Sequence, residues 1–164
     1  MINHKERIHD LEGREELRKL CSGVILDLGS ADRPICEEAI TVDSCKVYLP
    51  KIVADVSMLP LSDEYADTII ASHILEHLDN TIDVLNEWKR VLKTNGKIGI
   101  MVPHGEYVDE INLGDSSMTH RQLFTEKTLE LFLKHVGFRE VIVTRIERPP
   151  AYLECPAIIA TAIK

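Results

Sequence analysis

Residues 24–32 read Val24-Ile25-Leu26-Asp27-Leu28-Gly29-Ser30-Ala31-Asp32, a short apolar run that ends on an acid and a glycine. An apolar run bounded by turn-forming residues is typical of a buried parallel strand. Asp27 stands where such a strand leaves its sheet, and Gly29 lets the backbone turn there without a side chain in the way. This segment therefore predicts an open α/β sheet. Because ligands of such sheets bind beyond the carboxyl ends of the strands, it also predicts which edge of the sheet binds a ligand.

Two further candidate strands also finish on acids. Residues 39–43 end on Asp43, and residues 51–55 end on Asp55. Residues 67–72 are rich in β-branched side chains, end on Ser72 and predict a fourth strand. Since the carboxyl ends of parallel strands meet at one edge of a sheet, we expect the three aspartates to lie side by side along that edge.

Helical periodicity predicts a helix over residues 10–21, stopped by Gly23, and another over residues 80–93. The second has the apolar stripe Val84, Leu85, Trp88, Val91 and Leu92, with Asp79 or Asn80 to cap its start and Asn95-Gly96 to close its end. About ten residues separate the first two strands, so a connecting helix there has room for a turn or two, with Asp32 as its cap.

The second half of the chain also contains strand and helix signals. A strand is predicted over residues 97–102, a long loop resembling a lid over 104–124, and a helix between a cap at Thr125 and a stop at Gly137. Residues 138–146 and 157–163 predict an antiparallel pair of strands. The fold class expected is α/β, with a doubly wound, mostly parallel sheet, helices on both faces and an antiparallel C-terminal strand.

Composition limits the classes of function. The 164 residues suit a single domain, residues 1–164, that begins with an N-terminal helical segment over residues 1–22. A net charge of −8 with scattered basic residues disfavours nucleic acid, and no apolar run reaches the roughly 20 residues that span a membrane. The polar N-terminus predicts a cytoplasmic protein, and the four cysteines form no C-x-x-C pair, so we expect no metal ligands.

The ordered set of segments resembles the class I S-adenosylmethionine-dependent methyltransferases, in particular their small type 11-like domain. Residues 27–31 stand where that family has its D-x-G-x-G loop, residues 71–78 (Ala-Ser-His-Ile-Leu-Glu-His-Leu) match its fourth strand and exit, and residues 96–100 match the start of its fifth. The resemblance runs from Val24 to about Pro103 and, more weakly, over residues 120–138. One departure is Ala31, which replaces the second glycine of the family's loop.

The resemblance implies S-adenosylmethionine as the cofactor. It assigns the ribose hydroxyls to Asp43, whose carboxylate suits a diol through paired charge-assisted hydrogen bonds. It assigns the adenine to Asp55 and Val56, and the cationic end of the cofactor to Asp27. The remaining residues of the predicted cofactor site are Gly29, Ser30, Ser44, Ser72 and His73.

Methyl transfer needs orientation and exclusion of water more than acid–base chemistry. A general base is required only for a protonated acceptor, and the predicted catalytic residues are His77 and His104, with His73 and His120 as further candidates. The acceptor expected is a small molecule or a peptide. The short crossovers between the first strands leave room for a second subunit to complete the pocket, which makes a homo-oligomer one expectation.

Two alternatives stay open at this point. One is a methyltransferase-like binding or regulatory subunit without catalysis, suggested by Ala31 and by the lack of a separate substrate-recognition domain. The other is a dinucleotide-dependent oxidoreductase, which requires a glycine-rich phosphate turn after the first strand. Ser30-Ala31-Asp32-Arg33 is not such a turn.

Overall fold

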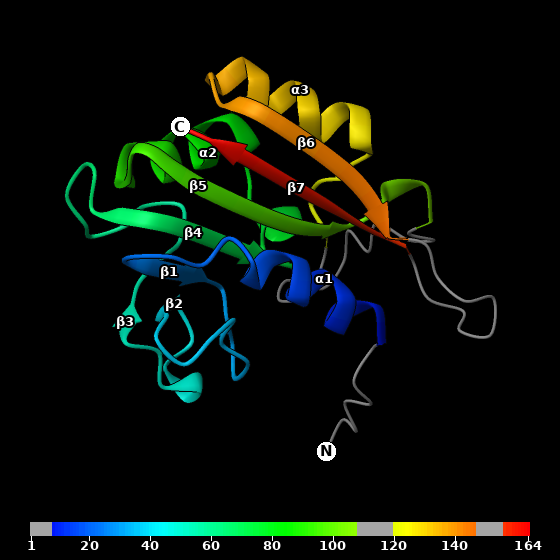
Figure 1. Ribbon diagram of the computed structural model, residues 1–164. Coiled ribbons are helices and arrows are strands. Elements are labelled where there is room, and N and C mark those ends of the chain that lie inside the picture. Colours follow the sequence, from blue (N-terminus) through cyan, green and yellow to red (C-terminus); the bar gives the residue numbers. More distant parts are fainter. Residues whose placement is uncertain (1–7, 108–119, 147–155) are drawn as a thin grey trace.

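A seven-stranded sheet forms the centre of the protein in a computed structural model, which describes residues 8–107, 120–146 and 156–164 (Figure 1). The strands lie in the order β3-β2-β1-β4-β5-β7-β6. Their bounds are β1 Ile25–Leu28, β2 Ile40–Asp43, β3 Ile52–Val53, β4 Ala66–Ser72, β5 Leu92–Pro103, β6 Arg139–Ile146 and β7 Ala157–Ile163.

The first five strands pair in parallel, whereas β7 pairs antiparallel with both β5 and β6. This confirms the predicted fold class and the antiparallel C-terminal pair. Every residue of β1 is buried, because β1 is central and covered on both faces, and such strands read as continuous apolar runs.

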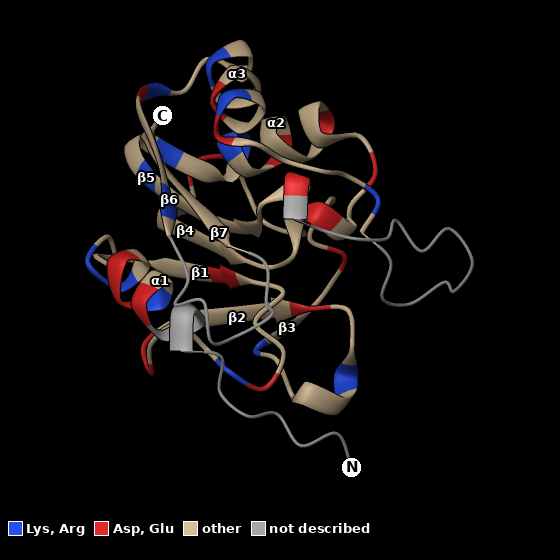
Figure 2. Ribbon diagram, turned by 90° about the vertical axis from the view of Figure 1, so that its right-hand side faces the viewer, with Lys and Arg blue, Asp and Glu red and all other residues tan. Residues whose placement is uncertain are grey.

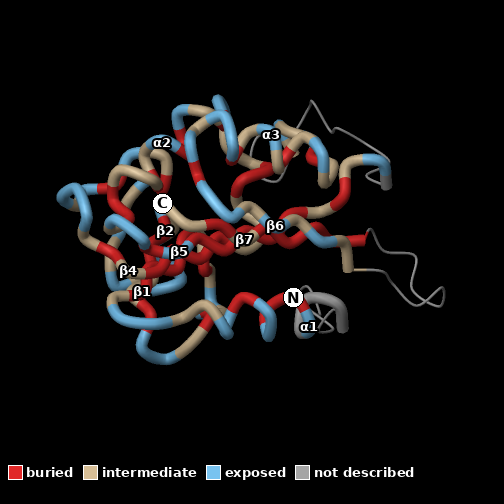
Figure 3. Tube along the Cα trace, turned by 45° about the horizontal axis from the view of Figure 1, so that its top comes forward, coloured by how far each residue is buried: buried red, intermediate tan, exposed pale blue. Residues whose placement is uncertain are grey.

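Helices cover both faces of the sheet, as predicted. Figure 3 shows α2 (Thr81–Val91) and α3 (Glu126–Val136) on one face and α1 (Ile8–Arg18) on the other. The larger core lies under α2 and α3 and includes the fully buried Trp88. A smaller core lies on the α1 face and includes Leu17, Ile35 and Met101.

Local capping signals set the ends of α3 where the sequence predicts them. The Thr125 side chain accepts a hydrogen bond from the Thr128 amide, and the Thr128 side chain accepts one from the Thr125 amide in return. Gly137 ends the helix at a φ of 87°, a left-handed conformation that glycine adopts without steric cost. Both predicted ends are therefore confirmed.

The ends of α2 differ from the prediction. Asn80 takes the N-cap position, but its side chain donates to Asp83 and does not cap the helix. The helix ends at Val91, because Leu92 is extended and pairs with Ala66 of β4. The prediction that Asn95-Gly96 closes this helix is therefore wrong: those residues lie within β5.

Smaller differences concern element lengths. The first helix ends at Arg18, before the predicted limit, and β3 covers only two residues, so Asp55 lies beyond the strand. The crossover between β1 and β2 contains turns and no helix, because Asp27 and two arginines of α1 hold its backbone, as described below. Most of the predicted lid lies outside the described residues. None of the described helices is long and apolar enough to cross a membrane.

Candidate functional site

The carboxyl ends of β2, β1 and β4 meet at one edge of the sheet. Leu28 of β1 is in register with Val42 of β2 and with Ala71 of β4. Acidic residues mark the ends of β1 and β2 in Figure 2. Gly29, directly after β1, and Asp43 and Ser72, the last residues of β2 and β4, therefore lie at adjacent positions along that edge.

Asp43 is bound to the loop that follows β1. Its Oδ2 accepts a hydrogen bond from the Ala31 amide at 3.1 Å, and its Oδ1 accepts one from the Cys45 amide at 2.8 Å. The side chain is buried, at 9% exposure. Each carboxylate oxygen has two lone pairs, so each retains acceptor capacity for a further donor such as a hydroxyl. Ser44, the next residue, is exposed.

The loop at Gly29 leaves no room for a larger residue. Gly29 has a φ of +68°, and a Cβ there would lie 2.7 Å from Cγ1 of Ile74. Ser30 is buried, and its Oγ has no hydrogen-bond partner within the described part of the chain. Ala31 adopts a φ of 49°, the left-handed conformation that glycine favours. A buried hydroxyl without a partner is what a polar ligand at this loop would satisfy.

Asp27 lies beneath the same loop, on the α1 side of the sheet. Its Oδ2 accepts a hydrogen bond from the Ile35 amide at 2.5 Å, and its side chain is 1% exposed. Burial raises the pKa of Asp27 to about 6, against the opposing effects of the Ile35 hydrogen bond and the Arg14 charge. Asp27 therefore fixes the backbone of the 29–35 loop.

Two arginines of α1 hold that loop as well. Arg14 donates to the carbonyl oxygens of Arg33 and Pro34 at 2.6 and 2.9 Å, and Arg18 donates to that of Ile35 at 2.8 Å. Sequence reasoning missed this role, because no local pattern links a helix to a loop that follows the next strand.

Asp55 and Val56 lie in a turn after β3. Asp55 is exposed, and its Oδ1 accepts hydrogen bonds from both the amide and the hydroxyl of Ser57. Val56 is buried, and its carbonyl oxygen accepts from Nε1 of Trp88 at 2.8 Å. The three predicted aspartates thus occupy one edge but differ in surroundings: Asp27 and Asp43 hold the 29–35 loop, whereas Asp55 is exposed in a turn of its own.

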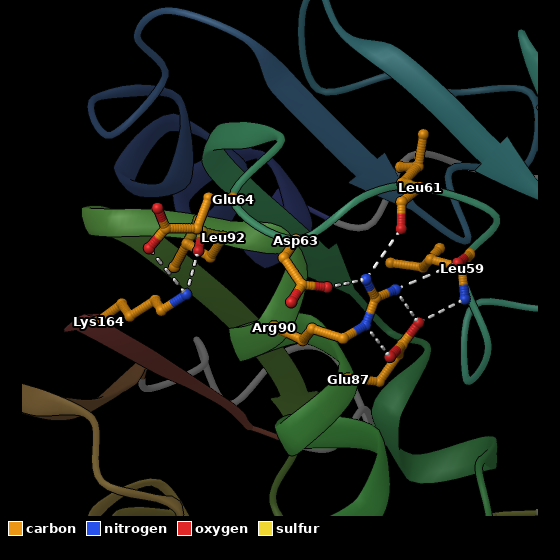
Figure 4. A network of polar contacts seen from close by, with 8 residues as sticks. All are labelled: Leu59, Leu61, Asp63, Glu64, Glu87, Arg90, Leu92 and Lys164. Atoms are coloured by element: carbon orange, nitrogen blue, oxygen red, sulfur yellow. Dashed lines mark hydrogen bonds and ion pairs between the residues drawn. The ribbon is translucent and has the colours of Figure 1, made fainter.

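Helix α2 holds the segment that follows Asp55, as Figure 4 shows. Glu87 accepts from the Leu59 amide at 2.8 Å, and Arg90 donates to the carbonyl oxygens of Leu59 and Leu61. Hydrogen bonding to Arg90 lowers the pKa of Glu87, which keeps this acceptor charged. No local pattern in the sequence indicates these contacts, since the partners are backbone atoms far along the chain.

The exit of β4 brings titratable side chains together. His73 directly follows Ser72, has a φ of 53°, and donates its amide to Met101 of β5 at 2.8 Å. Glu76 and His77 follow in a 3-10 turn, η2 (Leu75–His77), and His120 lies against His77 with ring centroids 5.0 Å apart. The structure thus groups His73, His77 and His120 around Glu76, which the sequence matched only as part of a motif.

His104 forms hydrogen bonds with Glu126 and Glu106, which do not belong to this group. Its Nε2 is 2.8 Å from Glu126 of α3, and its Nδ1 accepts from the Glu106 amide at 3.3 Å. The ring is 2% exposed. In this arrangement both nitrogens are engaged, so the ring links the end of β5 to α3, and a role as general base stays a prediction.

An apolar groove of about 390 Å³ opens between α2 and α3. It is lined by Ile82, Thr128, Leu131, Phe132 and His135. None of these is a predicted site residue, so the groove is separate from the set at the carboxyl edge.

Residues 16–100, just over half of the chain, match a family described as a methyltransferase domain. The chain belongs to this methyltransferase family. Membership of this family places the chain among the class I S-adenosylmethionine-dependent methyltransferases, as the sequence pattern predicts. The matched residues include the whole edge from Asp27 to His77.

Solved structures share the methyltransferase fold over nearly the whole chain. An Archaeoglobus fulgidus structure described as a SAM-dependent methyltransferase has a TM-score of 0.74 at 19% identity, covering 95% of this chain and 94% of that one. A Thermotoga maritima structure described as a possible histamine N-methyltransferase also has a TM-score of 0.74, at 17% identity, covering 96% and 91%.

A Burkholderia thailandensis 1,6-didemethyltoxoflavin-N1-methyltransferase was solved with S-adenosylhomocysteine bound. It has a TM-score of 0.72 at 19% identity, covering 97% of this chain and 79% of that one. A curated relative, an uncharacterized protein of Methanocaldococcus jannaschii, is 32% identical over 74 residues, which is 44% of this chain. The match spans about a third (32%) of the length of that relative.

The edge formed by the carboxyl ends of β2, β1 and β4 fits the family's cofactor, S-adenosylmethionine. Asp43 retains acceptor capacity toward a diol, Gly29 keeps the loop free of a side chain, and the Ser30 hydroxyl is buried without a partner among the described residues. Ala31 has a φ of 49°, in the left-handed region that glycine favours, so this position keeps a turn of the kind that a glycine would form.

Proposed function

We propose that this chain binds S-adenosylmethionine at the carboxyl ends of β2, β1 and β4 and transfers its methyl group to a small-molecule or peptidic acceptor. The observation that carries the proposal is the contact of Asp43 with the Ala31 amide, which places an acidic side chain with spare acceptor capacity against a glycine-containing loop. The family match supports the same cofactor.

Each part of the edge has a separate binding role in this proposal. Asp43 accepts the ribose hydroxyls, and the loop of Gly29 and Ser30 borders the methionine moiety. The turn at Asp55 and Val56 borders the adenine, and α2 keeps that turn in place through Trp88. Asp27 acts through the loop that it holds and not by contact, because it is buried beneath the Ile35 amide.

When bound, the cofactor supplies an electrophilic methyl group on its sulfonium sulfur. That sulfur is the leaving group when an acceptor attacks the methyl carbon in line. The chain positions the acceptor opposite the departing sulfur and excludes water. Orientation alone lowers the activation barrier substantially. For an acceptor that carries a proton, His77 is the candidate base, because its imidazole lies at the exit of β4 and is partly exposed.

The binding step is tested by calorimetry with S-adenosylhomocysteine and S-adenosylmethionine. We expect saturable binding of one molecule per chain. The chain has a single tryptophan, Trp88, which donates to Val56 beside the proposed adenine turn, so its fluorescence gives a second readout. An absence of heat and of any fluorescence change with both compounds would overturn the proposal.

A binding-only subunit is the second candidate function, raised by Ala31 in place of glycine. The two candidates separate once binding is established. Formation of S-adenosylhomocysteine with a panel of amines, thiols, phenols and short peptides shows catalysis. Binding without product across the panel, in a chain whose His77→Ala variant behaves identically, would favour the regulatory subunit.

A further inference from the structure

The exit of β4 contains a buried carboxylate with no hydrogen-bond partner among the described residues. Glu76 is 1% exposed, and neither Oε1 nor Oε2 accepts a hydrogen bond there. Two imidazoles approach it, with Nδ1 of His73 at 3.4 Å and Nε2 of His77 at 3.9 Å from Oε1. Buried carboxylates are normally paired with a cation or bound to a metal. The cost of burying Glu76 therefore points to a positive charge at this place.

Three side chains surround the position where such a charge would sit. One ligand atom from each of Glu76, His77 and His120 lies within 4.8 Å of the others. Around a tetrahedral ion with bonds of about 2.1 Å, neighbouring ligand atoms are roughly 3.4 Å apart. The three groups therefore need to close in by at most about 1.4 Å, which side-chain rotation of two partly exposed imidazoles can supply.

The backbone fixes the two segments that carry these ligands. The carbonyl oxygen of Glu76 accepts hydrogen bonds from the amides of Arg121 and Gln122, at 2.7 and 3.1 Å. The Arg121 side chain also pairs with Asp79, just after the 3-10 turn. His120 is thereby held next to the Glu76–His77 turn, and hydrogen bonds around a metal site orient its ligands in the same way.

We propose that Glu76, His77 and His120 bind a divalent transition-metal ion, with His73 beside the carboxylate as a positioning residue. Two imidazoles and one carboxylate suit Zn²⁺ and its neighbours in the first row, whereas Mg²⁺ and Ca²⁺ prefer oxygen ligands throughout. Three protein ligands leave a coordination position open, as in catalytic zinc sites. No spacing pattern indicates the site, because His120 comes from a distant segment, and this proposal replaces the expectation of no metal ligands.

The open position has a use that rests on the proposed methyl transfer. Because η2 begins three residues after the end of β4, at the same edge of the sheet, an ion there would bind an oxygen or nitrogen of the acceptor and lower its pKa. In that case the ion replaces His77 as the group that activates the acceptor, since His77 is then a ligand and not a base. The metal site itself does not depend on the cofactor, since none of its ligands belongs to the predicted cofactor set.

The test uses the full chain, freed of metal by dialysis against a chelator, without cofactor. Calorimetric titration with Zn²⁺ is expected to show one ion per chain. Titration with Co²⁺ is expected to give visible d–d absorption bands without thiolate charge-transfer bands. His120→Ala, His77→Ala and Glu76→Gln are each expected to weaken Zn²⁺ binding at least about tenfold.

Two matched variants control for other ligands. His135→Ala removes an exposed histidine of α3, and Cys21→Ser removes one of two neighbouring thiols on the α1 face. Both are expected to keep the affinity of the wild type. Circular dichroism of each metal-free variant checks folding, and His120→Ala keeps the test valid if Glu76→Gln does not fold.

Absence of stoichiometric Zn²⁺ binding would overturn the site, as would binding that survives His120→Ala or that shows thiolate bands. Either result leaves the binding of S-adenosylhomocysteine untouched. Loss of nucleoside binding with metal binding intact would instead count against the proposed function alone.

Discussion

The Oδ2 atom of Asp43 accepts a hydrogen bond from the backbone amide of Ala31 at 3.1 Å, so the end of β2 is tied to the loop after β1. The two residues come from neighbouring parallel strands, and their contact brings an acceptor and a tight backbone turn together. This contact defines the proposed ribose site.

Asp43→Ala is expected to weaken binding of S-adenosylhomocysteine by about 1–3 kcal/mol, because the ribose hydroxyls lose a charged acceptor. Calorimetry measures the change. Glu130→Ala, which removes an exposed carboxylate of α3 that pairs with Lys134, serves as the control and should leave the affinity unchanged. An unaltered dissociation constant in Asp43→Ala would remove the ribose assignment.

Asp27→Asn tests the buried acid through the pH dependence of stability. Burial raises the pKa of Asp27 to about 6 from its ordinary value of 3.8, so the folded chain binds this proton more tightly than the unfolded chain. The contribution of Asp27 to the free energy of unfolding is therefore full below about pH 4 and falls by roughly 3 kcal/mol as the pH rises past about 6.

The amide side chain of the Asp27→Asn variant would still accept from the Ile35 amide but would carry no charge. We expect the variant to be more stable than the wild type at about pH 8, with the difference vanishing below about pH 4. Urea denaturation across that range measures it. A difference that does not vary with pH would show that the acid is not the cause.

Gly29→Ala is expected to destabilise the fold for two separate reasons. The left-handed conformation costs an alanine about 1–2 kcal/mol, and the new Cβ would lie 2.7 Å from Cγ1 of Ile74. The second cost depends on Ile74, so it should be smaller in an Ile74→Ala background. A double-mutant cycle by chemical denaturation separates the two; strictly additive effects would contradict the close contact.

Ala31→Gly should have the opposite sign. Ala31 holds a φ of 49°, and glycine adopts this conformation without the steric cost while keeping the amide that donates to Asp43. The gain is expected to be at most about 1 kcal/mol, since the unfolded chain also gains freedom. Thermal denaturation measures it, and a clear loss of stability would mean that the methyl group of Ala31 packs favourably.

Trp88→Phe removes the hydrogen bond to the Val56 carbonyl, which is buried beside α2. The unsatisfied carbonyl is expected to cost about 1–3 kcal/mol of stability. Because the Asp55–Val56 turn loses one of its anchors, adenine binding should weaken as well. Equilibrium dialysis with S-adenosylhomocysteine measures the second effect, and a stability loss without any change in affinity would separate the turn from the cofactor.

The elements predictable from sequence are those fixed by local signals. Thr125 and Gly137 set the ends of α3 through contacts within a few residues, and the apolar run of β1 reflects its burial. The end of α2 was not predictable in this way, because the pairing of Leu92 with Ala66 of β4 overrides the turn signal of Asn95-Gly96.

The edge of the sheet where the strand-end acids lie was predictable, but the surroundings of each acid were not. Strand-end acids indicated the edge correctly, but the face that each acid occupies depends on where its strand stops. Asp27 lies one residue before the end of β1 and therefore faces the α1 side, under the loop. The approach of His120 to Glu76 arises only from the folded path of the chain, so no spacing in the sequence could have indicated it.

The two arginines of α1 have a practical consequence for anyone who trims this protein. The family match begins at residue 16, within that helix, whereas Arg14 lies before it and holds the carbonyls of Arg33 and Pro34. A fragment that starts at residue 16 and runs to the C-terminus would contain all seven strands but lose the hydrogen bonds from Arg14 to the 29–35 loop. If that loop borders the cofactor as proposed, we expect the fragment to bind S-adenosylhomocysteine more weakly than the full chain, a deficit easily mistaken for lack of activity.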